Sequence, residues 1–147
     1  MQVIHLRARH TEYLADFIRR IDFVDTIKHS RNIKETEFDY YVVTGETRTL
    51  VENAIRQCFD FEIEFSTIRM HRTFAHKQIG PHIDDGFPGY NTLVIRLDDG
   101  DPRLIVGDEL RDERVGRGYC IPEGTRHSVK VGKSDRYSLV AWYREVK

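Results

Sequence analysis

Residues 135–143 read Asp-Arg-Tyr-Ser-Leu-Val-Ala-Trp-Tyr, and the alternation in this segment decides the fold class. In a strand, residues i and i+2 point to the same face. One face would therefore carry Arg136, Ser138, Val140 and Trp142. The other face would carry Tyr137, Leu139, Ala141 and Tyr143. Both faces are mostly apolar, which is typical of a central strand covered on both sides.

Short strands separated by turns are expected along the rest of the chain after Asp60. Phe61, Ile63 and Phe65 alternate with glutamates, which is the period of a strand. Further β-rich runs occupy residues 67–74, 91–97, 103–106, 117–122, 127–131 and 136–143. Segments rich in Gly, Pro or Asp separate these runs. Many short strands with such turns indicate a sandwich or a barrel.

Two amphipathic helices are expected in the first 60 residues. Apolar residues at helical spacing run from Thr11, a candidate N-cap, to about Asp22, and again from about Thr47 to Cys58. Residues 39–44 favour a short strand, and residues 28–37 a surface loop. We therefore expect one domain over residues 1–147, mainly β with N-terminal helices. Residues 1–60 would form a mostly helical support, and residues 61–147 the β core.

The composition is that of a globular chain with balanced charge. Of 147 residues, 23 are Lys or Arg and 24 are Asp or Glu, which gives a net charge of −1. This balance argues against a nucleic-acid partner, although it still allows a local basic patch. No run approaches the ~20 apolar residues of a membrane span, and the first ten residues lack a signal-peptide core. Cys58 and Cys120 show no metal or redox spacing, so we expect reduced thiols in a cytoplasmic protein with no membrane partner.

A His-x-Asp motif at the start of the β region is a candidate metal site. His82 and Asp84 would share one face of a strand. His127 is the best candidate for a third ligand, because it shares a face with Val129 and Val131 and is expected to point inward. Two histidines and one carboxylate form the facial triad of non-heme Fe(II) oxygenases, which leaves coordination positions open. The motif taken alone is weak evidence and favours a turn aspartate beside a surface histidine.

Arg136 needs a partner if its strand is covered on both faces, because an unpaired buried charge is costly. The carboxylate of a ligand would suit the planar guanidinium, and Ser138 adds a hydroxyl on the same face. A structural salt bridge from Arg136 to Asp108, Glu109 or Asp84 is the alternative.

The strand expected before the His-x-Asp motif also has a polar face. Arg69, His71 and Thr73 share this face, which makes it a candidate inward face. Arg69 and His71 are therefore candidate pocket residues. On the strand after the motif, Asn91 and Thr92 are candidates for contact with a cosubstrate, with ordinary polar strand positions as the alternative.

Together these residues resemble the 2-oxoglutarate/Fe(II)-dependent oxygenases, and most of all their prolyl-hydroxylase-like branch. The pattern is His82-x-Asp84, then His127, then Arg136-x-Ser138. The flanking segments 107–110, 119–122 and 136–143 also resemble the end of that fold. The resemblance covers about residues 67–144.

The resemblance implies a double-stranded β-helix, a cupin-like jelly roll, with the two helices packed on its larger sheet. It implies that His82, Asp84 and His127 hold Fe(II), and that Arg136 and Ser138 bind the far carboxylate of 2-oxoglutarate. The implied activity is that of a dioxygenase (hydroxylase), which uses O2 and 2-oxoglutarate and releases succinate and CO2. The substrate would be an amino acid, a peptidyl residue or a small metabolite.

Two departures from the prolyl-hydroxylase pattern leave alternatives open. That branch often binds the cosubstrate through lysine, whereas this chain has Arg136. Only 42 residues separate Asp84 from His127, which leaves little chain for substrate-binding insertions. Both departures concern the substrate: they argue against peptidyl-proline and leave open a small molecule or recognition by the N-terminal part. The alternative interpretation is a cupin-like metal-binding protein, or another non-heme metal enzyme that does not use 2-oxoglutarate.

Overall fold

Two antiparallel sheets form the body of the protein in a computed structural model, which describes residues 1–23 and 38–147. The larger sheet has six strands in the order β1-β8-β5-β10-β3-β2, and the smaller has four in the order β4-β9-β6-β7. The strands of the larger sheet are β1 (Gln2–His5), β2 (Phe38–Val42), β3 (Ile63–Thr73), β5 (Asn91–Arg96), β8 (Arg117–Ile121) and β10 (Arg136–Glu145). Those of the smaller sheet are β4 (Ile79–His82), β6 (Leu104–Val106), β7 (Glu109–Leu110) and β9 (His127–Val129).

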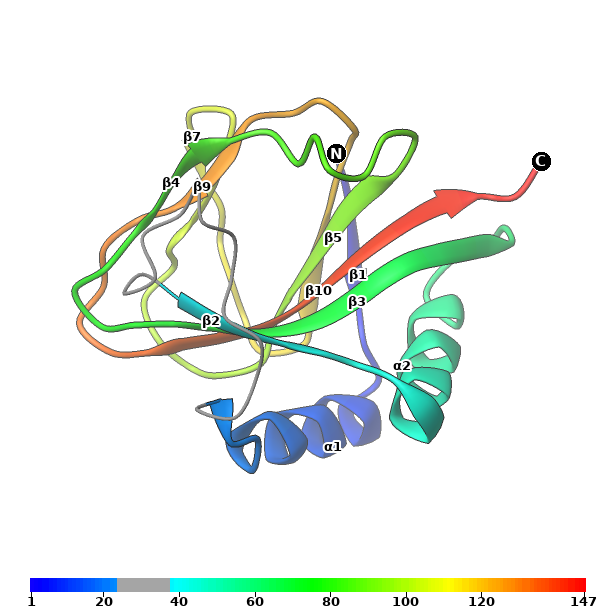
Figure 1. Ribbon diagram of the computed structural model, residues 1–147, viewed down its shortest axis with the longest axis horizontal. Helices are drawn as coiled ribbons and strands as arrows, with labels where there is room; N and C mark the ends of the chain where they lie inside the picture. Colours follow the sequence, from blue (N-terminus) through cyan, green and yellow to red (C-terminus); the bar gives the residue numbers. More distant parts are fainter. Residues whose placement is uncertain (24–37) are drawn as a thin grey trace.

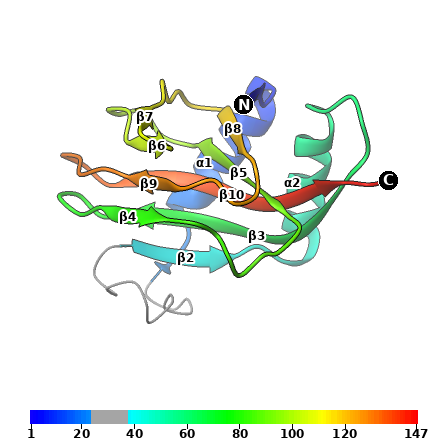
Figure 2. The ribbon, with the colours of Figure 1, turned by 90° about the horizontal axis from the view of Figure 1, so that it is seen from above.

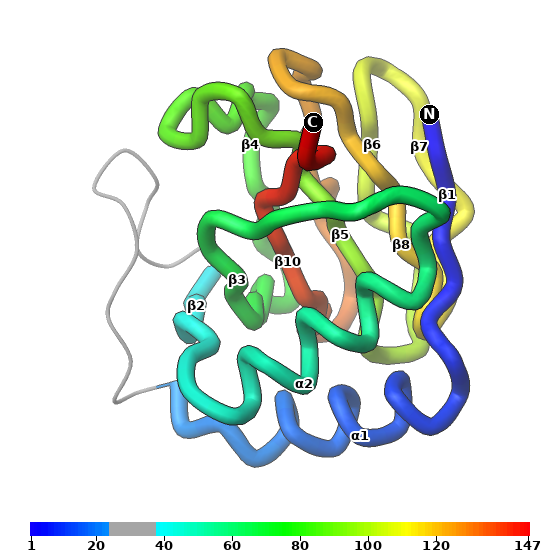
Figure 3. The backbone as a smooth tube through the Cα atoms, turned by 90° about the vertical axis from the view of Figure 1, so that its right-hand side faces the viewer, coloured from blue at the N-terminus to red at the C-terminus, as the bar shows by residue number. Residues whose placement is uncertain are grey.

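The helices α1 (Ala8–Arg19) and α2 (Gly45–Arg56) lie on the outer side of the larger sheet, away from β4 and β9 (Figure 1). Figure 3 shows both helices on this same side in a second view. Among the described residues, neither helix is long and apolar enough to cross a bilayer. The surface loop expected at residues 28–37 lies outside the described residues.

β10 lies in the middle of the larger sheet because both of its faces are apolar. It pairs with β3 on one side and β5 on the other, and Figure 2 shows β2, β3, β10 and β5 side by side. The outer face of β10 contributes Leu139, Ala141 and Tyr143 to the main core, which also contains Leu14 of α1 and Ile55 of α2. Burial of these side chains fastens the helices to the sheet. The expected packing of two helices on the larger sheet is confirmed.

A second, smaller apolar cluster lies between the two sheets. It is formed by Val94, Leu104, Val106, Tyr119 and Ile121. The inner face of the larger sheet therefore packs partly on the smaller sheet and partly lines the cavity described below. Two facing antiparallel sheets with this strand order form a jelly roll, so the expected fold class is confirmed.

The amino-terminal region differs from the sequence expectation in two details. α1 begins at Ala8, so the interpretation of Thr11 as its N-cap is wrong. Thr11 lies inside the helix, where its hydroxyl donates to the carbonyl of Arg7 at 3.1 Å, an alternative that threonine often adopts. The region also supplies both edges of the larger sheet, because β1 and β2 are its outermost strands.

Candidate metal centre and its pocket

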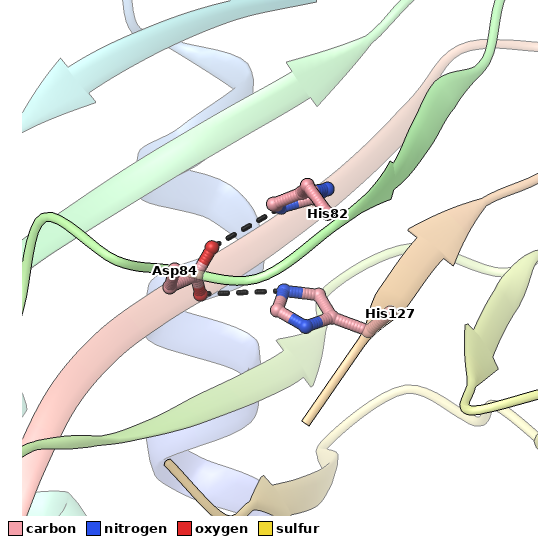
Figure 4. Close-up of side chains that lie close together, drawn as sticks. All are labelled: His82, Asp84 and His127. Atoms are coloured by element: carbon pink, nitrogen blue, oxygen red, sulfur yellow. Dashed lines mark ion pairs between the residues drawn. The ribbon is translucent and has the colours of Figure 1, made fainter. Parts of the chain in front are cut away.

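His82, Asp84 and His127 lie together at one end of the smaller sheet (Figure 4). β4 and β9 pair so that His82 is directly opposite His127, and their ring centroids are 4.4 Å apart. Asp84 follows the end of β4 and turns its carboxylate toward both rings. The candidate ligand atoms all lie within 4.8 Å of one another. The structure thus brings together the three residues that the sequence singles out.

Both histidine rings present the nitrogen that a metal would need. Each Nδ1 donates to the backbone carbonyl two residues before it, at 2.8 Å for His82 and 3.0 Å for His127. A carbonyl oxygen only accepts, so Nδ1 carries the hydrogen. Each Nε2 faces Asp84, at 3.1 Å from Oδ1 for His82 and 3.2 Å from Oδ2 for His127. Backbone contacts of this kind fix the ring orientation of metal-binding histidines.

The Asp84 carboxylate is held in place by neighbours on the inner face of the larger sheet. Its Oδ2 accepts from Thr92 Oγ1 at 2.7 Å and from the indole N–H of Trp142 at 3.2 Å. Burial alone would raise the pKa of Asp84, but the hydrogen bonds from His127, His82 and Thr92 outweigh it and hold that pKa well below its usual range. Asp84 is therefore an anion across the physiological range. Burial opposes protonation of His82, yet the hydrogen bond to Asp84 raises the pKa of its imidazole.

A cavity of about 700 Å³ opens beside the three residues, between the two sheets. Besides the three candidate ligands, its polar lining includes Arg69, His71, Thr92, Arg126, Arg136 and Ser138. Its aromatic lining is Phe38, Phe87 and Trp142. A concave, largely apolar site with a few convergent polar groups is typical of a small-molecule pocket. Arg69 and His71 therefore lie on the inward face, as the alternation of β3 suggests.

Arg136 is the buried first residue of β10, lines the cavity and already has a carboxylate partner. Its Nη2 lies 2.5 Å from Oε2 of Glu113, and its Nε lies 3.2 Å from Oε1. The remaining terminal nitrogen, Nη1, donates to Ser138 Oγ at 3.3 Å. In the described part of the chain, none of Asp108, Glu109 and Asp84 is the partner, so those three alternatives for the salt bridge are wrong.

Glu113 is the acceptor at the centre of a buried polar cluster. Besides Arg136, it accepts from Arg96 Nη1 at 3.1 Å and from the backbone N–H groups of residues 103 and 104 at 3.0 and 3.1 Å. Burial would raise its pKa, but the positive charge and hydrogen bonds of Arg136 lower it to about 2, with help from Arg96. Glu113 is thus ionised at neutral pH.

The buried cluster retains an excess of positive charge. It contains three arginines, Arg96, Arg103 and Arg136, and two carboxylates, Glu113 and Asp98. Among the described residues, Arg103 donates to backbone carbonyls and forms no ion pair of its own, although it lies within the field of Glu113 and Asp98. The cavity floor near Arg136 is therefore suited to one more anion.

Two candidate residues on β5 make contacts within the protein, and their expected contact with a cosubstrate stays a prediction. Thr92 contacts Asp84 and holds it. The Asn91 amide oxygen accepts from the backbone N–H of Glu123 and so fastens a loop. Trp142 is buried, stacks on Phe87 with ring centroids 3.9 Å apart and donates to Asp84.

Solved structures with this fold include 2-oxoglutarate/Fe(II) oxygenases and a DMSP lyase. A prolyl-4-hydroxylase of Pseudomonas putida is 19% identical over 99% of this chain and 91% of its own, with a TM-score of 0.68. The viral collagen prolyl hydroxylase vCPH of Paramecium Bursaria Chlorella virus-1 is 14% identical over 99% of this chain and 96% of its own, with a TM-score of 0.67. The non-heme alpha-ketoglutarate-dependent epimerase SnoN from nogalamycin biosynthesis is 13% identical over 97% of this chain and 76% of its own, with a TM-score of 0.73.

No protein-family model matches the chain, and no curated protein matches it. At these identities, the likeness concerns the fold. The chain shares the fold of the 2-oxoglutarate/Fe(II) oxygenases, including prolyl hydroxylases, and the resemblance drawn from the sequence is confirmed at that level.

Proposed function

We propose that the protein is a 2-oxoglutarate- and Fe(II)-dependent dioxygenase that hydroxylates a small molecule or a peptidyl residue and releases succinate and CO2. The observation that carries this proposal is the common cavity. A ready facial triad and the Arg136–Ser138 pair line the same space between the sheets. The oxygenase fold supports the assignment.

The residues present suit Fe(II). His82 and His127 offer Nε2 atoms whose rings are fixed through Nδ1, and Asp84 offers an ionised carboxylate. Imidazole and carboxylate ligands without thiolate are typical of non-heme iron, and three protein ligands leave positions for other molecules. When bound, Fe(II) supplies the activation of O2. The protein fixes the ligands, and Thr92 and Trp142 prevent the carboxylate from rotating away.

Arg136 and Ser138 are proposed to bind the far carboxylate of 2-oxoglutarate. Glu113 occupies the Nε and Nη2 side of the guanidinium, so Nη1 and the Ser138 hydroxyl are the groups that remain for a ligand. The excess positive charge of the buried cluster favours a carboxylate there. A charge-assisted hydrogen bond in such a dry site is stronger than one in water.

The aromatic wall of the cavity protects the site from water. Phe87 stacks on Trp142 with nearly parallel rings, at an interplanar angle of 11°, and Trp142 in turn contacts Asp84. Both rings line the cavity beside the carboxylate. Exclusion of water strengthens the electrostatic interactions inside the site and limits side reactions.

A non-heme metal protein that does not use 2-oxoglutarate is the second candidate. The Glu113–Arg136 ion pair favours it, because it satisfies most of the guanidinium without a ligand. The reaction outcome also varies on this fold, since SnoN is an epimerase.

Succinate release from 2-oxoglutarate, with Fe(II) and ascorbate present, separates the two candidates. We expect wild type to release succinate and the His82→Ala variant to lose Fe(II) in an anaerobic titration. Arg136→Lys keeps the charge but loses the planar fork, so 2-oxoglutarate affinity should fall about tenfold or more while metal affinity is retained. Equal metal binding by His82→Ala and wild type would contradict the proposed site. Equal 2-oxoglutarate affinity in Arg136→Lys would contradict the role of Arg136.

A further inference from the structure

Arg69 is a cation in the cavity wall whose charge has no protein partner in residues 1–23 and 38–147. It lies on the inner face of β3, and no carboxylate of these residues forms an ion pair with it. Its Nε is buried and has no hydrogen-bond partner there. Its guanidinium carbon instead lies near three aromatic rings, at 4.2 Å from the Tyr40 centroid, 5.0 Å from Trp142 and 5.7 Å from Phe87.

Four other arginines on or beside the strands show what Arg69 lacks. Arg72 pairs with Asp39, Arg96 with Asp98 and Glu113, and Arg136 with Glu113. Arg103 donates to four backbone carbonyls. Aromatic faces compensate a buried cation only in part. The hydrogen-bonding side of the Arg69 guanidinium therefore remains available to a ligand.

Asp84 does not serve as that partner, although its charge acts on Arg69. Its carboxylate is already engaged by His82, His127, Thr92 and Trp142. Burial lowers the pKa of Arg69, which is the expected response of a cation that has lost water without gaining an anion.

Arg69 is separate from the proposed 2-oxoglutarate site but adjacent to the candidate metal centre. Along β3, Arg69 is opposite Val140, whereas Thr73 is opposite Arg136. Four residues of a strand span about 13 Å, so the two arginines enter the cavity at different levels. The Trp142 ring that Arg69 covers donates its N–H to Asp84, so a ligand on Arg69 would lie close to the triad.

We propose that Arg69 binds a carboxylate group of the substrate, so that the enzyme acts on an acidic small molecule or on a residue beside a free carboxylate. A planar carboxylate suits a guanidinium held against aromatic rings, because the fork accepts it edge-on without disturbing the stacking. The choice of reaction rests on the proposed function, whereas the carboxylate site rests on the surroundings of Arg69 alone.

The lone tryptophan of the chain, Trp142, makes this site directly measurable. The test follows its emission while acetate, benzoate, acetamide, benzamide and methyl phosphate are titrated into the full-length protein. One series uses protein saturated with Mn(II) and 2-oxoglutarate, which fills the other sites without turnover. A second series uses metal-free protein.

We expect acetate or benzoate to bind below about 10 mM and at least about tenfold tighter than the matching amide, since a charge-assisted bond is lost in the amide. The Arg69→Gln variant should remove this preference while Mn(II) affinity is retained. Arg56→Gln is the matched control, because Arg56 also lies over an aromatic ring, Phe65 at 5.2 Å, but outside the cavity on α2. It should bind the carboxylates as wild type does.

Several results would overturn the proposal. These are equal binding of amides and carboxylates, an Arg69→Gln variant that binds as wild type does, tighter binding of methyl phosphate, or no carboxylate binding below about 10 mM. Failure of the dioxygenase proposal is a different result, namely absence of succinate release, and the metal-free series remains interpretable in that case.

Discussion

Replacement of Glu113 by glutamine tests the buried charge cluster that supports Arg136. The change keeps the size of the side chain and removes one negative charge. Three arginines would then face a single remaining carboxylate, that of Asp98. The new amide group also places an N–H donor where Glu113 accepts only, so at least one donor of the cluster loses its acceptor.

The expected loss is a large share of the stability of a small domain. Breaking a buried ion pair by removal of one partner costs about 3–5 kcal/mol. The pKa of Glu113 gives a similar value, because a lowering from 4.5 to about 2 corresponds to about 3 kcal/mol of stabilisation at neutral pH. Only 1% of the side chain is exposed, so little of this is lost to solvent screening. A domain of this size is stable by about 5–15 kcal/mol in total.

The pH dependence of stability has a defined sign. The pKa of Glu113 is lower in the folded state, so its contribution is present in full above about pH 4.5, the unfolded value. It is lost progressively as the pH falls toward about 2. The Glu113→Gln variant should therefore show a smaller decline in unfolding free energy over this acid range than wild type shows.

Urea denaturation at several pH values measures both effects. Glu109→Gln is the matched control, because Glu109 is also paired with an arginine, Arg111 at 3.4 Å, but its side chain is 67% exposed. It should change the unfolding free energy by no more than about 0.5 kcal/mol. A loss below about 1 kcal/mol for Glu113→Gln, or an unchanged acid decline, would refute the assignment of Glu113 as the anion of this cluster.

Two further substitutions test packing and the support of the metal ligand. Gly118→Ala would place a Cβ 2.9 Å from Cγ1 of Ile4 and 2.9 Å from Cγ1 of Ile95, so we expect the unfolding free energy to fall by about 1–3 kcal/mol. An unchanged denaturation midpoint would show that these side chains move aside without cost. Thr92→Val removes the 2.7 Å hydrogen bond to Asp84 and should weaken Mn(II) binding about 10–100-fold in a titration. The same change at Thr73, whose buried hydroxyl has no partner among the described residues, should leave Mn(II) affinity unaltered, and equal losses in both variants would argue against the Asp84 contact.

Strands with a strong alternation could be predicted from the sequence, whereas strands defined by distant partners could not. β10 and β5 carry apolar side chains at regular spacing, and their positions agree with the expectation. β1 has a single buried residue, Ile4, and is a strand only because β8 lies beside it. β4 contains Gly80 and Pro81, which are poor strand formers, and it is held mainly by β9.

The site shows the same division between local pattern and tertiary contact. His82 and Asp84 could be paired from their spacing, and His127 from the inward face of its strand. The partner of Arg136 could not be predicted in this way. Glu113 lies in a segment of charged residues, 111–114, which reads as a surface loop. Only in the folded chain does Glu113 accept hydrogen bonds from the backbone at the start of β6 and from Arg136.

The pairing of β1 with β8 sets an order of events for a chain made from its amino terminus. Val3 is synthesised before its partner, Tyr119, which follows more than a hundred residues later in the chain. β1 therefore has no strand to pair with when it is made, and β8 keeps one unpaired edge until β1 binds to it. Such distant pairing slows folding and leaves a strand edge open to other chains in the meantime. The larger sheet is thus completed by a strand that is made long before its partner.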